Sequence, residues 1–136
     1  MDLDRAREFL RAHHRSVLAT FRADGRPQLS PVTAAVDDDG RVLISTREPA
    51  MKTRNLRRDP RASLCVMNDA FYGDWLQVEG DTEIISLPAA MDLLVDYYRR
   101  VAGEHPDWDD YRAAMARDRR VILRITITRV GPNVSG

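Results

Sequence analysis

The sequence is poor in residues that form disulfides or bind metal ions. Its single cysteine, Cys65, excludes an internal disulfide and any cysteine-rich metal site. Cys65 lies in the apolar run 62–67, where we expect a packed thiol rather than a nucleophile. The three histidines, His13, His14 and His105, have no spacing typical of a metal site, so we expect them at the surface. The sequence therefore predicts no metal centre.

The sequence also lacks the features of a membrane protein or a nucleic-acid-binding protein. It has no run of about 18 apolar residues, the length that a transmembrane helix needs, and its charged start, 1–5, does not resemble a signal peptide. The 21 basic and 21 acidic residues give a formal net charge of zero, without the basic excess of a duplex-binding domain. We therefore expect a cytoplasmic protein with neither a membrane nor a nucleic acid as partner.

Three common catalytic motifs are missing as well. There is no serine nucleophile elbow, no Gly-x-Gly-x-x-Gly fingerprint and no Gly-x-x-x-x-Gly-Lys phosphate loop. The acidic run Asp37-Asp38-Asp39-Gly40 lacks the spread of ligands of an EF-hand loop, so a solvated hairpin turn is the better interpretation. Any chemistry must therefore depend on another arrangement of residues.

Lysine is the scarcest charged residue, because the chain has twenty arginines and only one lysine, Lys52. A lysine is a compact point charge on a flexible stem, whereas a guanidinium is a rigid planar fork, so the two are not equivalent at a phosphate. One ammonium kept next to a strand end indicates an anion site. The alternative is that Lys52 is a chance survivor in an arginine-biased proteome.

The residues around Lys52 have the chemistry of a phosphate site. Hydroxyl groups, amides and backbone N–H groups at a helix start, together with an ammonium, supply charge-assisted hydrogen bonds to phosphate. Such groups are found close together at Ser45, Thr46, Arg47, Lys52, Arg54 and Asn55. A solvated basic helix is the alternative, and it is the better interpretation for Arg57, Arg58 and Arg61.

The periodicity of apolar residues predicts one domain, 1–136, with six strands and peripheral helices. The expected strands are 16–21, 28–36, 41–46, 61–68, 75–85 and 119–130. The expected helices are 3–14, 51–59, 89–101 and 107–115. Strands joined mainly by hairpins argue against a doubly wound parallel sheet. The sequence instead predicts a mainly β fold, a six-stranded antiparallel barrel.

A few residues predict turns and irregularities in this barrel. The pair Asp24-Gly25 predicts a hairpin turn, and Gly80 predicts a bulge. Pro31 inside a strand indicates an edge, a bulge or an interruption that faces a ligand. Residues 131–136 are expected to form a loose tail.

Trp75 follows an aromatic-rich loop, 70–74, and opens the fifth expected strand. An indole at a strand end could flank a flat ring, and equally it could plug the core or anchor an interface. The sequence leaves both interpretations open.

The motifs occur in an order that is typical of a known group of proteins. They are Leu18-Ala19-Thr20, Asp24-Gly25-Arg26-Pro27-Gln28-Leu29-Ser30-Pro31-Val32, Ser45-Thr46, Lys52-Thr53-Arg54-Asn55-Leu56-Arg57-Arg58-Asp59-Pro60 and Val78-Glu79-Gly80. Further matches at 102–112 and 118–121 extend over nearly the whole chain. This pattern resembles the pyridoxamine 5′-phosphate oxidase-like split-barrel superfamily. More narrowly, it is similar to the actinobacterial B group of deazaflavin-dependent oxidoreductases, which use coenzyme F420.

The resemblance implies a homodimer with two cofactor sites at the subunit interface, each built from both chains. It implies that Lys52 reaches the cofactor phosphate with help from Ser45 and Thr46, and that the strand 28–32 lies beside the deazaflavin and its ribityl chain. The remaining cofactor-binding candidates are Gln28, Ser30, Pro31, Val32, Met51, Arg54, Asn55 and Trp75.

Two departures from the family pattern affect the choice of cofactor. The oxidases that bind FMN and act on pyridoxamine phosphate have an arginine and a lysine on the second strand, whereas 29–36 carries no positive charge here. This weakens the vitamin B6 interpretation. Close relatives have an arginine two residues before the lysine, where this chain has Ala50, so Arg47 or Arg54 is expected to replace it.

The expected function is that of a reductase in which reduced F420 delivers a hydride to an unidentified organic acceptor. The hydride chemistry belongs to the cofactor, so that step requires no acid or base from the protein. If the product needs a proton, Tyr72 or a water is the candidate donor, and a structural role is the alternative for Tyr72. An FMN-binding enzyme of the same superfamily and a non-catalytic flavin or deazaflavin carrier are the alternative functions.

Overall fold

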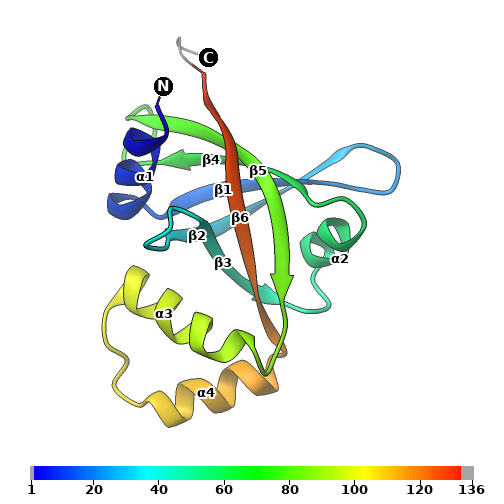
Figure 1. Cartoon of the computed structure of the whole chain (residues 1–136), viewed down its shortest axis with the longest axis vertical. Helices are drawn as coiled ribbons and strands as arrows, with labels where there is room; N and C mark the ends of the chain where they lie inside the picture. The colour runs from blue at the N-terminus through cyan, green and yellow to red at the C-terminus, as the bar shows by residue number, and fades with distance from the viewer. Residues whose placement is uncertain (1, 133–136) are drawn as a thin grey trace.

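Six antiparallel strands close into a barrel in this computed structural model, which describes residues 2–132 (Figure 1). The strands are β1 Arg15–Phe21, β2 Pro27–Val36, β3 Val42–Arg47, β4 Arg61–Met67, β5 Trp75–Ile85 and β6 Arg120–Gly131. The helices are α1 Leu3–Ala12, α2 Met51–Arg58, α3 Ala90–Ala102 and α4 Trp108–Arg117. These elements confirm the predicted mainly β fold, with small shifts at the element ends.

The strand order around the barrel is β1-β2-β3-β6-β5-β4, with each neighbour antiparallel. The pairs β1–β2, β2–β3 and β4–β5 are consecutive in the sequence, as the predicted hairpin connections require. The pairings of β1 with β4 and of β3 with β6 join distant segments, and the second sets Thr46 opposite Val121 and Arg47 opposite Arg120. This pairing brings the start of the last strand next to the segment that leads to Lys52.

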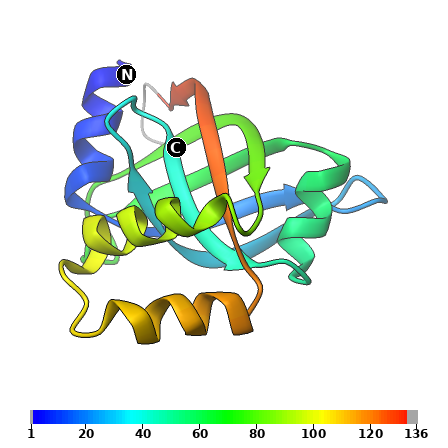
Figure 2. The same ribbon diagram turned by 60° about the horizontal axis from the view of Figure 1, so that its bottom comes forward.

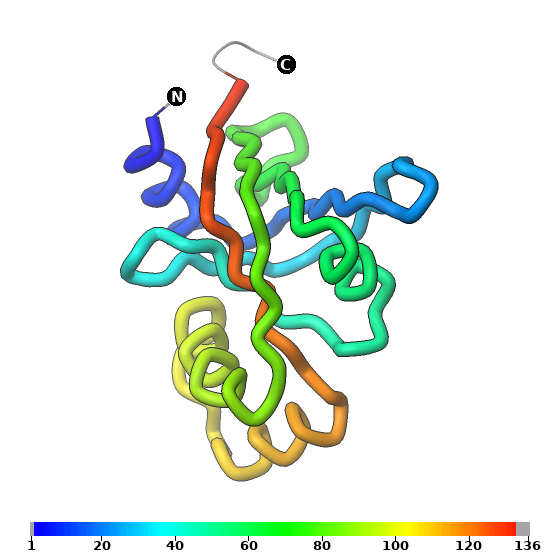
Figure 3. The backbone as a smooth tube through the Cα atoms, turned by 45° about the vertical axis from the view of Figure 1, so that its right-hand side comes forward, coloured from blue at the N-terminus to red at the C-terminus, as the bar shows by residue number. Residues whose placement is uncertain are grey.

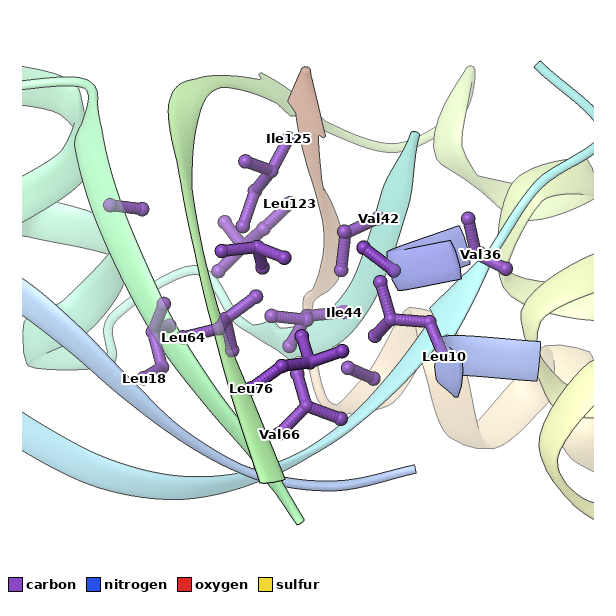
Figure 4. Close-up of a cluster of buried hydrophobic side chains, with 14 of the residues drawn as sticks. Leu10, Leu18, Val36, Val42, Ile44, Leu64, Val66, Leu76, Leu123 and Ile125 are labelled. Carbon is purple, nitrogen blue, oxygen red and sulfur yellow. The ribbon is translucent and has the colours of Figure 1, made fainter. Parts of the chain in front are cut away.

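The barrel interior is filled by alternate residues of the strands, because successive side chains of a strand point to opposite faces. In β1 and β4 every second residue is buried, among them Leu18, Leu64 and Val66. Figure 4 shows these side chains packed with Ile44 and Leu123 from the facing strands. The interior is therefore a packed hydrophobic core.

The helices cover different parts of the barrel. Leu10 of α1 and Leu56 of α2 join the interior core, whereas α3 and α4 pack on the outside. Leu94 of α3 and Tyr111 of α4 belong to a second cluster, which also contains Leu43 and Ile122 from the outer face of the sheet. Figure 2 shows α3 and α4 side by side along one face of the barrel. Within the described part of the chain, no helix is long and apolar enough to cross a membrane.

The predicted turn and bulge are both present. Gly25 has a φ of 85°, which suits glycine at the tip of the β1–β2 hairpin, and this hairpin projects from the barrel (Figure 3). The register of β5 against β6 shifts between Glu79 and Gly80. A Cβ at Gly80 would lie 2.1 Å from the carbonyl oxygen of Thr126, so the bulge needs glycine at this position.

Pro31 lies on a free edge of β2, which is one of the three interpretations that the sequence left open. Residues 27–33 of β2 pair only with β1, and 34–36 pair with β3. The missing amide of a proline therefore costs no ladder hydrogen bond there. The prediction of a loose tail at 131–136 is wrong for Gly131, because Gly131 pairs with Gln77 and extends β6. Residues 133–136 of that tail lie outside the described residues.

Candidate cofactor site

A cavity of about 940 Å³ lies between the outer face of the sheet and the α3–α4 pair. Its walls come from β1, β2 and β3 on one side and from α3 and α4 on the other, with the start of α2 and the start of β6 at one end. We call it the strand-end cavity. Five residues predicted for the site line it, namely Pro31, Val32, Ser45, Thr46 and Lys52.

Lys52 lies in the first turn of α2, immediately after the loop that leaves β3. That loop is held by the hydroxyl of Thr53, which donates to the carbonyl oxygen of Arg47 at 2.7 Å. The helix begins after Ala50, whose methyl group cannot cap the free backbone N–H groups. Lys52 is thereby fixed beside a helix start that has no side-chain cap, which is a favourable place for an anion.

The ammonium of Lys52 lies in an unfavourable electrostatic environment. Burial, and to a lesser extent the positive charge of Arg120, lower the pKa of Lys52. The ion pairs formed among residues 2–132 include neither Lys52 nor Arg120. The charged form of Lys52 is thus disfavoured by its surroundings, and a bound anion would reverse the effect.

Ser45 and Thr46 end β3 beside this lysine. Thr46 is buried and Ser45 is half-buried, because the two side chains point to opposite faces of the strand. Ser16 of β1 also lines the cavity, and its buried hydroxyl has no hydrogen-bond partner within the described structure. The cavity therefore combines hydroxyl groups with a cation, which is the donor set that the sequence predicts for phosphate.

Arg120 and Tyr97 are site residues that the sequence reasoning missed. Arg120, the first residue of β6, lines the cavity with its buried Nε unpartnered by any group among the described residues. Tyr97 of α3 also lines the cavity and donates its hydroxyl to the carbonyl oxygen of Thr33 at 2.8 Å. Burial raises the pKa of Tyr97, so its hydroxyl stays protonated. No local motif identifies either residue, because the fold brings them to Lys52.

Asn55 and Gln28 lie together but outside the lining of the strand-end cavity. The amide nitrogen of Asn55 donates to the hydroxyl of Thr20 at 3.1 Å and to Oε1 of Gln28 at 2.9 Å. Asn55 is 1% exposed, and its side-chain oxygen accepts a hydrogen bond from Arg58. These contacts join α2 to β1 and to the start of β2, which gives Asn55 a structural task within a single chain.

The other predicted residues are also apart from the strand-end cavity. Met51 and Arg54 are exposed on α2, and Ser30 is half-buried on β2. Tyr72 and Trp75 line a separate cavity of about 320 Å³, the aromatic-loop cavity, together with residues of 70–74 and Cys65. Burial raises the pKa of Cys65, which suits a packed thiol.

Met67 connects the two cavities. It is the last residue of β4, it lines both cavities, and it pairs with Arg15 of β1 on one side and with Trp75 of β5 on the other. The aromatic-loop cavity is lined mainly by apolar and aromatic groups, whereas the strand-end cavity has cations at one end. The arrangement offers an anion site and, beside it, apolar walls suited to a flat ring.

The closed antiparallel barrel is a split-barrel fold, and Lys52 and Arg120, which form no ion pair within residues 2–132, line a cavity on its outer face. A family model described as pyridoxamine 5′-phosphate oxidase matches residues 3–133. The chain therefore belongs to the pyridoxamine 5′-phosphate oxidase family, which confirms the resemblance seen in the sequence.

The chain is also similar to individual proteins. A curated relative, an F420H(2)-dependent biliverdin reductase of Mycobacterium tuberculosis (strain CDC 1551 / Oshkosh), is 28% identical over 129 residues, which cover 93% of this chain and 85% of the relative. The crystal structure of a conserved hypothetical protein of Mycobacterium tuberculosis has a TM-score of 0.75 at 27% identity and covers 100% of this chain and 92% of that one. An F420 reductase structure has a TM-score of 0.71 at 23% identity, over 91% of this chain and 94% of that one.

Proposed function

We propose that this protein is an F420-dependent reductase that holds the cofactor phosphate at Lys52. The observation that carries the proposal is the position of Lys52, which lines the strand-end cavity beside Ser45 and Thr46 and forms no ion pair within residues 2–132. The family match supports a flavin-type cofactor, and the name of the 28% identical relative favours F420. FMN is the alternative cofactor, because a phosphate site by itself suits both.

The residues of the cavity have separate tasks in this proposal. Lys52 and the backbone N–H groups at the start of α2 bind the phosphate, and the half-buried hydroxyl of Ser45 donates to its oxygens, while the buried Thr46 supports the strand end beside them. Pro31 and Val32 supply an apolar edge of β2 beside the ring system. The bound deazaflavin supplies the hydride, so the protein contributes placement and exclusion of water.

Reduction of the acceptor also needs a proton, and the candidate donors are a water and Tyr72. Tyr72 is 96% exposed at the aromatic loop, so a solvent water can reach the same region. We therefore assign the proton to water and keep Tyr72 as the alternative. A Tyr72→Phe variant with an unchanged turnover rate would support water, and a loss of turnover with unchanged cofactor affinity would support the tyrosine.

We further propose a homodimer that covers the exposed apolar residues. Leu29 is 65% exposed, Phe71 91% and Trp75 42%, which are large apolar side chains with high exposure in the isolated chain. Such groups mark interaction sites when they gather at a surface. Sedimentation equilibrium of the wild type and of Phe71→Asp tests this directly: we expect a dimer for the first and a shift toward monomer for the second. A monomeric wild type would refute it.

The test of the cofactor is a titration of the purified protein with oxidised F420 and with FMN. We expect tighter binding of F420 by the wild type and a loss of affinity in Lys52→Ala. The matched control is Arg129→Ala, which removes an exposed cation from β6 outside the strand-end cavity. Tighter binding of FMN than of F420 would show that FMN is the cofactor. Equal F420 affinity in wild type and Lys52→Ala would refute the role of Lys52.

Turnover separates a reductase from a carrier. We expect the wild type to reoxidise reduced F420 when an electrophilic acceptor such as biliverdin or a quinone is added, and to do so faster than the free cofactor. Tight binding of F420 without any acceleration across such acceptors would show a non-catalytic carrier.

A further inference from the structure

We propose that Arg120 is a second anion ligand of the strand-end cavity, and that Arg120 and Lys52 together bind the phosphate end of the cofactor. This inference rests on the proposed function and extends it to a residue from the other end of the chain. It also accounts for Ala50, where the resemblance leads us to expect an arginine. The missing cation is supplied by the first residue of β6.

Arg120 has a buried donor without a hydrogen-bond partner in the described structure. This donor is its Nε, and Arg120 forms none of the ion pairs among residues 2–132. Buried polar groups in proteins are almost always hydrogen-bonded, so a buried donor of a charged group that has no partner requires an explanation. An acceptor that enters the cavity satisfies this donor, and a phosphate oxygen is a suitable acceptor for a guanidinium.

Like charges lie close together around Arg120. Arg120 lies directly opposite Arg47 across the β3–β6 ladder. Its charge also lowers the pKa of Lys52. Like charges directly opposite each other in a sheet destabilise the fold. The fold therefore tolerates a repulsion that an anion between Lys52 and Arg120 would relieve.

The nearby acceptors are occupied or distant. The carboxylate of Glu48 pairs with Arg57 and accepts a hydrogen bond from Ser86. Asp110 also lines the cavity, but in the first turn of α4, about 10 Å along the helix from its last turn, where the chain approaches β6. Arg15 of β1 also lines the cavity, but its charge is paired with Asp69. Lys52 and Arg120 are therefore the two lining cations that no carboxylate among residues 2–132 pairs with, and a phosphate between them would serve both.

The other candidates for the missing cation fit less well. Arg54 is exposed on α2 and does not line the cavity. Arg47 is exposed, does not line the cavity, and donates its Nε to the carbonyl oxygen of Asp118 at 3.4 Å. Arg120 lines the same cavity as Lys52 and has a donor to offer.

The experiment compares Arg120→Leu with wild type, with Arg120→Lys as the conservative variant and Arg129→Leu as the matched control on β6. Affinities are measured for F420, for FMN and for the deazaflavin riboside that lacks a phosphate. We expect Arg120→Leu to bind F420 about tenfold to a hundredfold more weakly, the size of one charge-assisted hydrogen bond. Arg120→Lys should recover part of this loss, and Arg129→Leu should match wild type.

The phosphate-free ligand decides whether the effect arises from the anion. We expect the riboside to bind equally to wild type and Arg120→Leu, because it offers nothing for Arg120 to hold. A loss for both F420 and FMN assigns Arg120 to the phosphate itself, and a loss for F420 alone assigns it to the carboxylates beyond that phosphate. An equal loss for the riboside would overturn the inference, as would unchanged affinity for F420.

Thermal stability gives a readout that a purely structural role would not reproduce. In phosphate-free buffer without cofactor, we expect Arg120→Leu to melt at the same temperature as wild type or higher, because the variant removes a repulsion with Arg47 and Lys52. Added inorganic phosphate should stabilise wild type more than the variant. A lower melting temperature with unchanged F420 affinity would show a structural residue.

The result also separates this inference from the proposed function. If wild type binds F420 through Lys52 and Arg120→Leu changes nothing, the function stands and the role of Arg120 fails. If wild type binds FMN instead of F420 with a loss in Arg120→Leu, the anion role stands and the F420 proposal fails. If wild type binds neither cofactor, both fail.

Discussion

Two groups of cations near α2 differ in one respect, which is whether the fold supplies their partners. Arg57 pairs with Glu48, and Arg61 pairs with Asp59 and lies 4.8 Å from the ring centroid of Phe21. Lys52 and Arg120 have no ion-pair partner among the described residues, although both are partly buried. Cations that have ion-pair partners within the fold contribute to the charged surface of the protein. Cations that lack such partners inside a cavity are available to bind an anionic ligand.

The largest expected effect that tests this difference is the loss of Lys52. We expect Lys52→Ala to bind F420 about a hundredfold more weakly, or about 2.7 kcal/mol, because it removes a half-buried cation from the anion. The free energy of unfolding should stay the same or rise, since the charge is disfavoured in the free protein. Fluorescence titration and urea denaturation measure the two quantities. A large loss of stability with normal F420 affinity would show that Lys52 contributes to the fold and does not bind the ligand.

The next effect concerns Asn55, which the sequence placed in the cofactor site. We expect Asn55→Ala to lower the free energy of unfolding by about 1–3 kcal/mol, because buried partners lose their hydrogen bonds. The partners left behind are the hydroxyl of Thr20 and the side chain of Gln28. F420 affinity should change little. Normal stability together with weaker binding would instead confirm Asn55 as a cofactor ligand.

A smaller effect is expected at Arg57. Its side chain is 46% exposed, and its pair with Glu48 should contribute about 0.2–1 kcal/mol to stability. We expect Arg57→Ala to reduce stability within that range in denaturant melts and to leave F420 binding unchanged. If this variant bound F420 as weakly as Lys52→Ala, the division into satisfied and available cations would be refuted.

The smallest expected effect is the pH dependence of stability and affinity that arises from the titration of Lys52. Its folded pKa is lower than the ordinary value of 10.5, so between the two values the unfolded state binds more protons. Over that window the free energy of unfolding of the free protein rises with pH. Anion binding needs the charged form, so F420 affinity should fall with rising pH, starting below 10.5. A Lys52→Arg variant should show a flatter affinity profile, and identical profiles would contradict the assignment.

The elements of the barrel could be predicted because their signals are local. Alternating apolar residues marked the strands, and the Asp24-Gly25 pair and Gly80 marked a turn and a bulge. The pairing of β3 with β6 could not be predicted in this way, because it joins segments from the two halves of the chain. The arginine opposite Arg47 is therefore visible only in the folded structure.

The difference between local signals and long-range pairing also explains which site residues could be predicted from the sequence and which could not. The group of Ser45, Thr46 and Lys52 is continuous in sequence across one strand-to-helix corner, so its spacing was informative. Asn55 belongs to the same string, but it lies on another face of α2 and bonds to Thr20. Sequence proximity to a cation thus does not decide whether a polar side chain serves the ligand or the fold.

The most direct measurement is a crystal structure of the protein with F420 bound. The account predicts a phosphate oxygen within about 3 Å of Nζ of Lys52, with the guanidinium of Arg120 hydrogen-bonded to the same phosphate or to the next carboxylate. Arg57 and Arg61 should keep the partners they have without ligand. A phosphate bound at Arg57 and Arg58, or at the aromatic-loop cavity with Lys52 still unpaired, would contradict it.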